Sequence, residues 1–211
     1  MTPKPLKAAL IIMAKAPEAG LAKTRLIPAL GPEGAAHLAA RLLRHTVQTA
    51  MNAKTFSYRE LCVTPHVQHP VFDELKSSWP GQALTLTAQQ DGDLGARMRH
   101  AFERVLLDHD VAIMLGTDSP DLTAEVLDQS VRELDRHDAV FVPALDGGYA
   151  LIGLRQVIPT LFADMPWSSD AVMNLTRGRL RESGLSWYEH PPVADIDEPR
   201  DLTHLPAWFA T

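Results

Sequence analysis

Short apolar runs alternate along the chain with longer stretches in which apolar residues recur every three or four positions. The short runs are typical of buried strands, and the longer spacing is typical of helices packed against a sheet. The strand pattern covers residues 8–14, 58–63, 83–87, 111–115, 139–144, 149–154 and 185–190. This alternation predicts a layered α/β fold.

The helical pattern begins at Gly31-Pro32 and continues to Ala50, and it returns at 72–78, 94–107, 169–182 and after Pro199. A further helix is expected to start at Ser119-Pro120, with the serine as N-cap, and to run to about residue 137. No internal repeat, low-complexity tract or long linker interrupts the pattern. We therefore expect one domain over residues 1–211.

Composition narrows the functional classes. Of the 211 residues, 45% are hydrophobic and 22% are charged, as in ordinary globular proteins. The net charge of −6 argues against a nucleic-acid polymer as partner, because such binding needs a dense positive surface. No run reaches the roughly 20 apolar residues of a membrane span. The only cysteine, Cys62, cannot form an internal disulfide, so we expect a cytoplasmic protein.

Three cationic side chains follow the first predicted strand within eleven positions. A loop after a buried parallel strand lies at the carboxyl edge of the sheet, where open α/β folds bind ligands. The P-loop pattern is absent, because Ala22 and not glycine precedes Lys23-Thr24. A solvated basic loop is the alternative to a loop that binds a diphosphate or triphosphate. The residues expected at the phosphates are Lys15, Ala16, Gly20, Lys23, Thr24 and Arg25.

Carboxylates follow two other segments. Asp118 comes just after the strand at 111–115, where it could hold Mg²⁺ or Mn²⁺ against phosphate oxygens. The alternative is a role at the start of the next helix, but Ser119 already fits the cap. In Asp195-Ile196-Asp197, residues two apart point the same way in an extended chain, so both carboxylates could meet one ion.

The segment Asp146-Gly147-Gly148-Tyr149 joins two predicted strands. Asp-Gly is a strong tight-turn signal, so a bare hairpin is one interpretation. The other is a glycine shelf on which a ligand lies close to the backbone, with Asp146 or Tyr149 in polar contact.

Ordered motifs along nearly the whole chain resemble one family. They are Met13-Ala14-Lys15-Ala16-Pro17, Lys23-Thr24-Arg25-Leu26, Gly92-Asp93-Leu94-Gly95-Ala96-Arg97-Met98, Gly116-Thr117-Asp118-Ser119-Pro120, Asp146-Gly147-Gly148-Tyr149, Pro166-Trp167-Ser168 and Asp195-Ile196-Asp197. The chain resembles the DUF2064 proteins of the GT-A superfamily, also called rSAM/selenodomain-associated transferase 1.

The resemblance implies a three-layer α/β/α nucleotide-diphospho-sugar transferase fold with a mostly parallel sheet and one antiparallel strand. It implies that Lys23 and Arg25 contact phosphates, and that Asp118 and one or both of Asp195 and Asp197 bind Mg²⁺ or Mn²⁺. Arg97 and Trp167 match further motifs of the family; we expect Arg97 at the phosphates, and Gly147, Gly148, Tyr149 and Trp167 on the acceptor or donor-sugar side. Glu18-Ala19 departs from the family pattern before Gly20, and the glycine-rich loop of nucleotidyltransferases is absent.

Three functions remain open at this point. The first is a metal-dependent glycosyltransferase with a nucleotide-sugar donor and an unknown small-molecule acceptor, in which Asp118, Lys23 and Asp146 are the expected catalytic residues. The second is a nucleotidyltransferase, similar to guanylyltransferases, that acts on a small phosphorylated acceptor. The third is a nucleotide-binding protein without catalysis.

Overall fold

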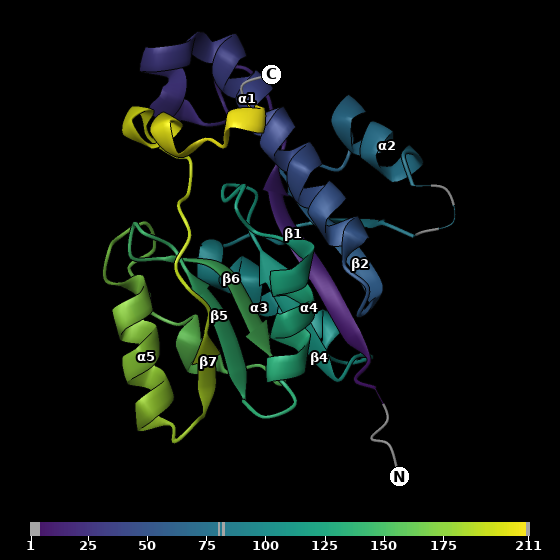
Figure 1. Cartoon of the computed structure of the whole chain (residues 1–211), viewed down its shortest axis with the longest axis vertical. Helices are drawn as coiled ribbons and strands as arrows, with labels where there is room; N and C mark the ends of the chain where they lie inside the picture. Colours follow the sequence, from purple (N-terminus) through teal and green to yellow (C-terminus); the bar gives the residue numbers. More distant parts are fainter. Residues whose placement is uncertain (1–4, 80, 82, 210–211) are drawn as a thin grey trace.

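A seven-stranded sheet with strand order β3-β2-β1-β4-β6-β5-β7 forms the centre of the protein. The computed structural model describes residues 5–79, 81 and 83–209 (Figure 1). The strands are β1 (Ala8–Lys15), β2 (Phe56–Thr64), β3 (Thr85–Ala88), β4 (Val111–Leu115), β5 (Ala139–Pro143), β6 (Tyr149–Leu154) and β7 (Trp187–Glu189). Neighbouring strands are parallel except where β6 runs antiparallel to β4 and β5. The expected α/β fold with a mostly parallel mixed sheet is confirmed.

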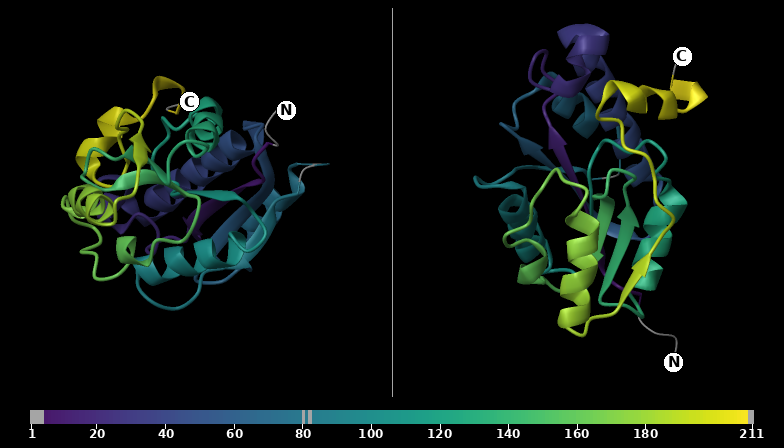
Figure 2. Two further views of the ribbon diagram at one scale, coloured as in Figure 1. Left: turned by 90° about the horizontal axis from the view of Figure 1, so that it is seen from below. Right: turned by 90° about the vertical axis from the view of Figure 1, so that its left-hand side faces the viewer.

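Helices cover both faces of this sheet, which gives the three expected layers (Figure 2). One face packs against α1 (Ile27–Asn52), α2 (Pro70–Ser77) and α4 (Ala124–Glu133), and the other against α3 (Leu94–Val105) and α5 (Val172–Glu182). Short 3-10 turns complete the chain: η1 (Thr24–Leu26), η2 (Pro159–Leu161), η3 (Pro199–His204) and η4 (Ala207–Phe209).

Strand β1 shows why the sheet is buried on both faces. Leu10 and Ile12 belong to the core under α1, whereas Ala9 and Ile11 belong to the core under α3 and α5, and all four are fully buried. Burial of each large aliphatic side chain contributes about 1.5–3 kcal/mol. The alternation stops at Lys15, which is exposed. The chain therefore leaves the core there and enters the first loop.

The register of the central strands sets the place of the site. Lys15 at the end of β1 lies opposite Thr64 at the end of β2, and Ile12 lies opposite Leu115 at the end of β4. Because these strands are parallel, the loops after β1 and β4 open at the same edge of the sheet. The first loop and the Asp118 loop, about a hundred residues apart in sequence, are thus neighbours in space.

The first long helix was expected to begin at Gly31-Pro32, but α1 begins at Ile27 and has a break at Gly31. Gly31 has a non-helical backbone (φ 71°, ψ 167°) inside α1, so regular helix follows from Pro32. The residues from Ile27 to Leu30 form an additional turn that apolar spacing did not predict.

The predicted start of the helix after β4 is wrong. Ser119 is buried, and α4 begins at Ala124 with Thr123 as its N-cap, whose hydroxyl accepts a hydrogen bond from the Val126 amide. Leu122 is buried as well, with 4% of its surface exposed. Burial of Leu122 requires one more turn before the helix, so the hydroxyl of Thr123 and not that of Ser119 reaches the free amides.

No helix within the described ranges combines the length and the apolar character needed to cross a membrane.

A histidine is buried between α4 and the edge of the sheet, and it should make the free energy of unfolding depend on pH. His190 lies 2.9 Å from the hydroxyl of Ser130, whose hydrogen is donated to the carbonyl of Val126. Burial lowers the pKa of His190, against a smaller opposing effect of Glu133. The unfolded chain therefore binds a proton near pH 6.5 that the folded chain rejects, and stability is lost as the pH falls below that value.

We expect His190→Gln to reduce the loss of unfolding free energy between pH 7.5 and pH 5, relative to the wild type. Chemical denaturation at both pH values measures this difference. An equal loss in both proteins would contradict the assignment.

Candidate functional site

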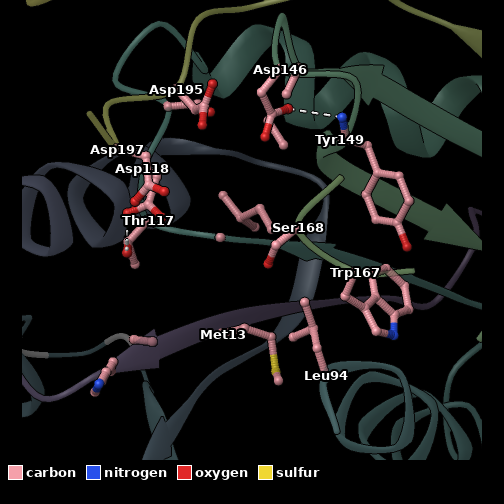
Figure 3. A pocket seen from close by; sticks show the side chains of 18 of the residues that line it. Met13, Leu94, Thr117, Asp118, Asp146, Tyr149, Trp167, Ser168, Asp195 and Asp197 are labelled. Carbon is pink, nitrogen blue, oxygen red and sulfur yellow. Dashed lines mark hydrogen bonds between the residues drawn. The ribbon is translucent and has the colours of Figure 1, made fainter. Parts of the chain in front are cut away.

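A cavity of about 610 Å³ opens at the carboxyl edge of the sheet. Figure 3 shows that Asp118, Asp195 and Asp197 lie on one side of it, with Tyr149 and Trp167 on the other. The predicted site residues that line it are Lys15, Lys23, Thr24, Arg25, Arg97, Asp118, Asp146, Gly148, Tyr149, Trp167, Asp195 and Asp197. Ala16, Gly20 and Gly147 lie in the same loops but are not among the lining residues. Motifs from distant parts of the sequence thus meet at one site.

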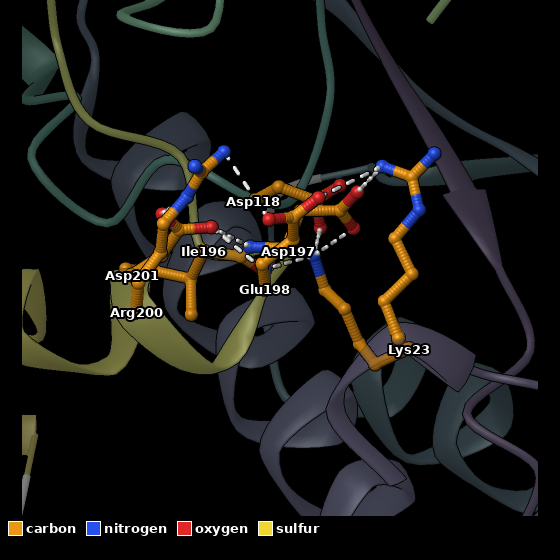
Figure 4. A network of polar contacts seen from close by, with 8 residues as sticks. Lys23, Asp118, Ile196, Asp197, Glu198, Arg200 and Asp201 are labelled. Carbon is orange, nitrogen blue, oxygen red and sulfur yellow. Dashed lines mark hydrogen bonds and ion pairs between the residues drawn. The ribbon is translucent and has the colours of Figure 1, made fainter. Parts of the chain in front are cut away.

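The side chain of Lys23 is the point on which the acidic residues converge. Its Nζ lies 2.6 Å from Oδ1 of Asp118 and 3.5 Å from Oδ1 of Asp197, and it donates a 2.5 Å hydrogen bond to the carbonyl of Ile196 (Figure 4). Only 6% of the Lys23 side chain is exposed, against 45% for Asp118 and 37% for Asp197. The lysine side chain is thus shielded from solvent, whereas both carboxylates are partly exposed at the cavity.

The backbone of the first loop turns Lys23 toward this position. Lys23 adopts the left-handed conformation (φ 47°, ψ 46°), which is uncommon for a residue with a side chain. Ala22 before it and Leu26 after it are both buried, and they fix the loop on either side. The left-handed backbone at Lys23 therefore lets Ala22 and Leu26 enter the core while the Lys23 side chain reaches the carboxylates.

The segment from Asp195 to Glu198 is held from both ends. Ile196 is fully buried, and its amide donates a hydrogen bond to the carbonyl of Asp118. On the other side, the carboxylate of Asp201 accepts hydrogen bonds from the amides of Asp197 and Glu198 at 3.1 and 2.7 Å. These bonds fix the place of Asp197 before any ligand arrives.

The remaining cations of the first loop are more exposed. Arg25 donates a hydrogen bond of 2.8 Å to Asp197, and the ammonium of Lys15 donates one of 2.8 Å to the carbonyl of Leu21. The amides of Thr24 and Arg25, the first two of η1, donate no hydrogen bond within the described part of the chain. Free amides after a left-handed residue form a concave anion-binding surface. On the other wall, Arg97 lines the cavity, and its Nε donates to the carbonyl of Gly92.

Asp195 and Asp146 form a second acidic pair at the cavity. Partial burial of Asp195, together with the negative charge of Asp146, raises the pKa of Asp195 to about 6. Asp146 itself accepts a 2.8 Å hydrogen bond from the amide of Gly148. The negative charge of Asp146 therefore favours a proton or a cation at Asp195.

The donor atoms fit a hard divalent cation, but the geometry is not that of a preformed metal centre. Asp118, Asp197 and the carbonyl of Ile196 offer oxygen ligands of the kind that Mg²⁺ and Mn²⁺ prefer. Their common focus is the ammonium of Lys23. Across the described ranges, no three His, Cys, Asp or Glu side chains are grouped so that they could hold a metal ion. A metal at this position requires Lys23 to move.

The opposite end of the cavity is apolar. Met13, Leu94 and Trp167 lie there (Figure 3), and Leu94 is 44% exposed. The ring of Trp167 meets that of Tyr149 edge to face, with 6.4 Å between centroids. The Oη of Tyr149 and the Nε1 of Trp167 are buried, and neither has a hydrogen-bond partner in the described structure. Burial also raises the pKa of Tyr149, so its hydroxyl stays protonated.

Some residues of the site were not predicted from the sequence. The carbonyl of Ile196 is one, because nothing in a sequence marks a backbone acceptor. Gln89 is another; it follows β3 and donates hydrogen bonds to the carbonyls of Ala14 and Cys62, which ties the ends of β1 and β2 together beside the cavity. Its position two residues after the predicted strand at 83–87 was an available signal.

The turn that carries Asp146 depends on a glycine. Gly147 has φ 93°, and a Cβ there would clash with the carbonyl of Asp170. Its own carbonyl accepts a 2.8 Å hydrogen bond from the amide of Met173 at the start of α5.

We expect Gly147→Ala to destabilise the fold by about 1–3 kcal/mol, because it combines a strained backbone with a steric clash. Gly178→Ala is the matched control: Gly178 lies inside α5 with open space around its Cβ position, and alanine there stabilises a helix by about 0.5–1 kcal/mol. Urea denaturation of both variants measures the effects, and equal stabilities would contradict the close packing of this turn.

Solved structures share this fold. A putative nucleotide-diphospho-sugar transferase from Desulfovibrio desulfuricans is 30% identical, covering 95% of this chain and 87% of its own, with a TM-score of 0.84. A 4-diphosphocytidyl-2C-methyl-D-erythritol synthase from Anaerococcus prevotii is 10% identical, with 98% and 97% covered and a TM-score of 0.67. Rv0371C from Mycobacterium tuberculosis, in complex with manganese, is 14% identical, with 95% and 97% covered and a TM-score of 0.56.

No curated protein matches the chain. The model of one family, described as "Uncharacterized protein conserved in bacteria (DUF2064)", matches residues 31–169. This range includes the Asp118 and Asp146 loops and ends just after Trp167, and the fold is that of nucleotide-diphospho-sugar transferases. The chain belongs to the DUF2064 family.

Proposed function

We propose that this protein is a transferase whose donor is a nucleotide sugar and whose acceptor is a small molecule. The observation that carries the proposal is the meeting of Lys23, Asp118 and Asp197 beside further cations in one cavity. Transfer of the glycosyl or nucleotidyl type is also what structural similarity supports, and the similar chain from Desulfovibrio desulfuricans is described as a putative nucleotide-diphospho-sugar transferase.

The first loop is the proposed place of the donor diphosphate. Lys23 and Arg25 would hold its oxygens, together with the free amides of Thr24 and Arg25, while Lys15 and Arg97 stand on the walls of the same cavity. These groups neutralise the charge that develops on the leaving diphosphate. A divalent ion held by Asp118 and Asp197, with phosphate oxygens as its other ligands, would add Lewis-acid stabilisation there.

The apolar end is the proposed place of the sugar or the acceptor. Gly148 lines the cavity, with Gly147 beside it in the same turn, and Tyr149 and Trp167 offer two buried hydrogen-bonding groups without partners in the described structure. Asp146 stands between the two ends of the cavity and is the proposed base. In this reaction the acceptor oxygen bonds to the anomeric carbon, the bond to the diphosphate oxygen breaks, and Asp146 takes the hydroxyl proton.

Nucleotidyl transfer is the second candidate, and the amides beside Lys23 favour it. The sequence lacks the glycine-rich loop of nucleotidyltransferases, but the left-handed Lys23 leaves two neighbouring amides free without it. Here an acceptor phosphate oxygen would attack the α-phosphorus of a nucleoside triphosphate, and pyrophosphate would leave. A nucleotide-binding role without catalysis is the remaining alternative.

We expect a thermal-shift screen of nucleotides and nucleotide sugars to find a ligand that stabilises the protein in the presence of Mn²⁺. At a ligand concentration near 100 times Kd, the gain is about 2.7 kcal/mol, or a Tm rise of about 5–10 °C. Asp118→Asn should abolish this rise. Asp121→Asn is the control, because Asp121 is exposed and lies outside the residues that line the cavity. If no nucleotide shifts the wild type under any metal condition, the site assignment is wrong.

Product analysis separates the candidate reactions. With the ligand from the screen and a panel of acceptors, the proposed glycosyl transfer releases a nucleoside diphosphate. Pyrophosphate as the product would support nucleotidyl transfer in its place. Binding without turnover over the whole panel would support the non-catalytic alternative.

A further inference from the structure

The ammonium of Lys23 lies where a bound cation would lie. Oxygens from two distant segments surround it: Asp118 after β4, and Asp197 and the carbonyl of Ile196 near the C-terminus. Nζ lies 2.6 Å from Oδ1 of Asp118, 3.5 Å from Oδ1 of Asp197 and 2.5 Å from the carbonyl of Ile196. Only 6% of the Lys23 side chain is exposed. The chain thus carries its own cation between the two carboxylates expected to bind a metal.

We propose that Lys23 is an internal substitute for the divalent ion, which leaves its place only when nucleotide phosphate binds. This inference rests on the proposed function, because it takes the phosphate as the group that receives Lys23. In the free protein the ammonium pairs with Asp118 and Asp197, and Arg25 supplies the second positive charge at Asp197. In the loaded protein the divalent ion takes over that role, and Lys23 turns to a phosphate oxygen.

Simultaneous occupancy of the position is excluded by distance and charge. A bound Mg²⁺ or Mn²⁺ would need its oxygen ligands at about 2.0–2.2 Å, inside the space that the ammonium now fills. An ammonium and a divalent ion that share the same carboxylates without an anion between them repel each other strongly at low dielectric. The opposite state, with neither cation present, leaves Asp197 with Arg25 alone and Asp118 without a cationic partner in the described part of the chain. Either Lys23 or the metal therefore holds the pair.

The exposed fractions of these side chains indicate from which side an ion can reach the carboxylates. The carboxylates of Asp118 and Asp197 line the cavity and are 45% and 37% exposed, so an ion can approach them from there, whereas the side chain of Lys23 is almost fully buried. Arg25 contacts the other oxygen of Asp197 at 2.8 Å. This second cation, with the hydrogen bond that the Asp197 amide donates to the Asp201 carboxylate, keeps Asp197 in place when the lysine leaves. The site is therefore prepared for the exchange without rearrangement of its acidic residues.

The consequence is positive coupling between metal and nucleotide. The free protein binds a divalent ion weakly because the ion must displace Lys23 unaided, whereas the nucleotide supplies the anion that Lys23 moves to. By linkage, the metal raises nucleotide affinity by the same factor by which the nucleotide raises metal affinity. The device would prevent the acidic pair from holding a metal when no donor is present.

Removal of the ammonium tests the exchange directly. Lys23→Met keeps the length of the side chain and deletes its charge; Lys15→Met makes the same charge change in the same loop, at a side chain that contacts the carbonyl of Leu21 and no carboxylate. Binding of Mn²⁺ without nucleotide is measured by electron paramagnetic resonance, and circular dichroism verifies that each variant is folded. We expect Lys23→Met to bind Mn²⁺ about 5- to 150-fold more tightly than the wild type. This range is the usual size of the coupling between two binding sites.

Lys15→Met should show no comparable gain. If Lys23→Met binds Mn²⁺ no more tightly than the wild type, or if Lys15→Met gains as much, the substitution of a lysine for the metal is refuted. Neither result depends on turnover or on nucleotide binding. The proposed function would survive this failure, since its own test is the nucleotide-dependent thermal shift.

A second measurement uses the wild-type protein and does not depend on the folding of a variant. The ¹⁵N-labelled ammonium signal of buried Lys23 is followed by NMR during titration. We expect Mg²⁺ alone to leave it in place, and Mg²⁺ together with the nucleotide found in the thermal screen to move it. A shift with Mg²⁺ alone, or none with a Mg²⁺–nucleotide complex that binds, would overturn the proposal.

Discussion

The site depends on one buried ammonium that neutralises carboxylates from two distant segments. Asp118 follows a central strand and Asp197 lies near the C-terminus, and each would repel the other without Lys23 between them. A buried charge is tolerated only when it is paired and hydrogen-bonded, so Lys23 needs the acidic residues as much as they need it. This mutual requirement joins the first loop, the Asp118 loop and the C-terminal segment into one structure.

The sheet positions the loops that converge on the site, and the loops carry the side chains that can contact a ligand. Parallel β1 and β4 end at the same edge. β5 ends there too, because β4 and β5 are both antiparallel to β6, and the Asp146 turn follows it. Rigid strands therefore place three loops around one cavity, with charge on one side and apolar side chains on the other. Such a division suits a substrate that has a phosphate at one end and a less polar group at the other.

The sequence predicted most of the sheet because an unbroken apolar run such as Val111–Leu115 can only be satisfied by burial on both faces. It predicted which loops meet, since loops after parallel strands share an edge. It failed at Ser119, where two possible caps compete and the burial of Leu122 decides between them. It also failed to predict that Lys23 faces carboxylates, because that contact depends on a left-handed backbone and on a carbonyl acceptor, and residue types encode neither.

The most direct test of the account is anomalous diffraction from crystals grown with Mn²⁺ and with the nucleotide that stabilises the protein. The account predicts a manganese peak between Asp118 and Asp197, with the ammonium of Lys23 moved from that position to a phosphate oxygen. A bound nucleotide with Lys23 still between the two carboxylates, or manganese bound elsewhere, would contradict it.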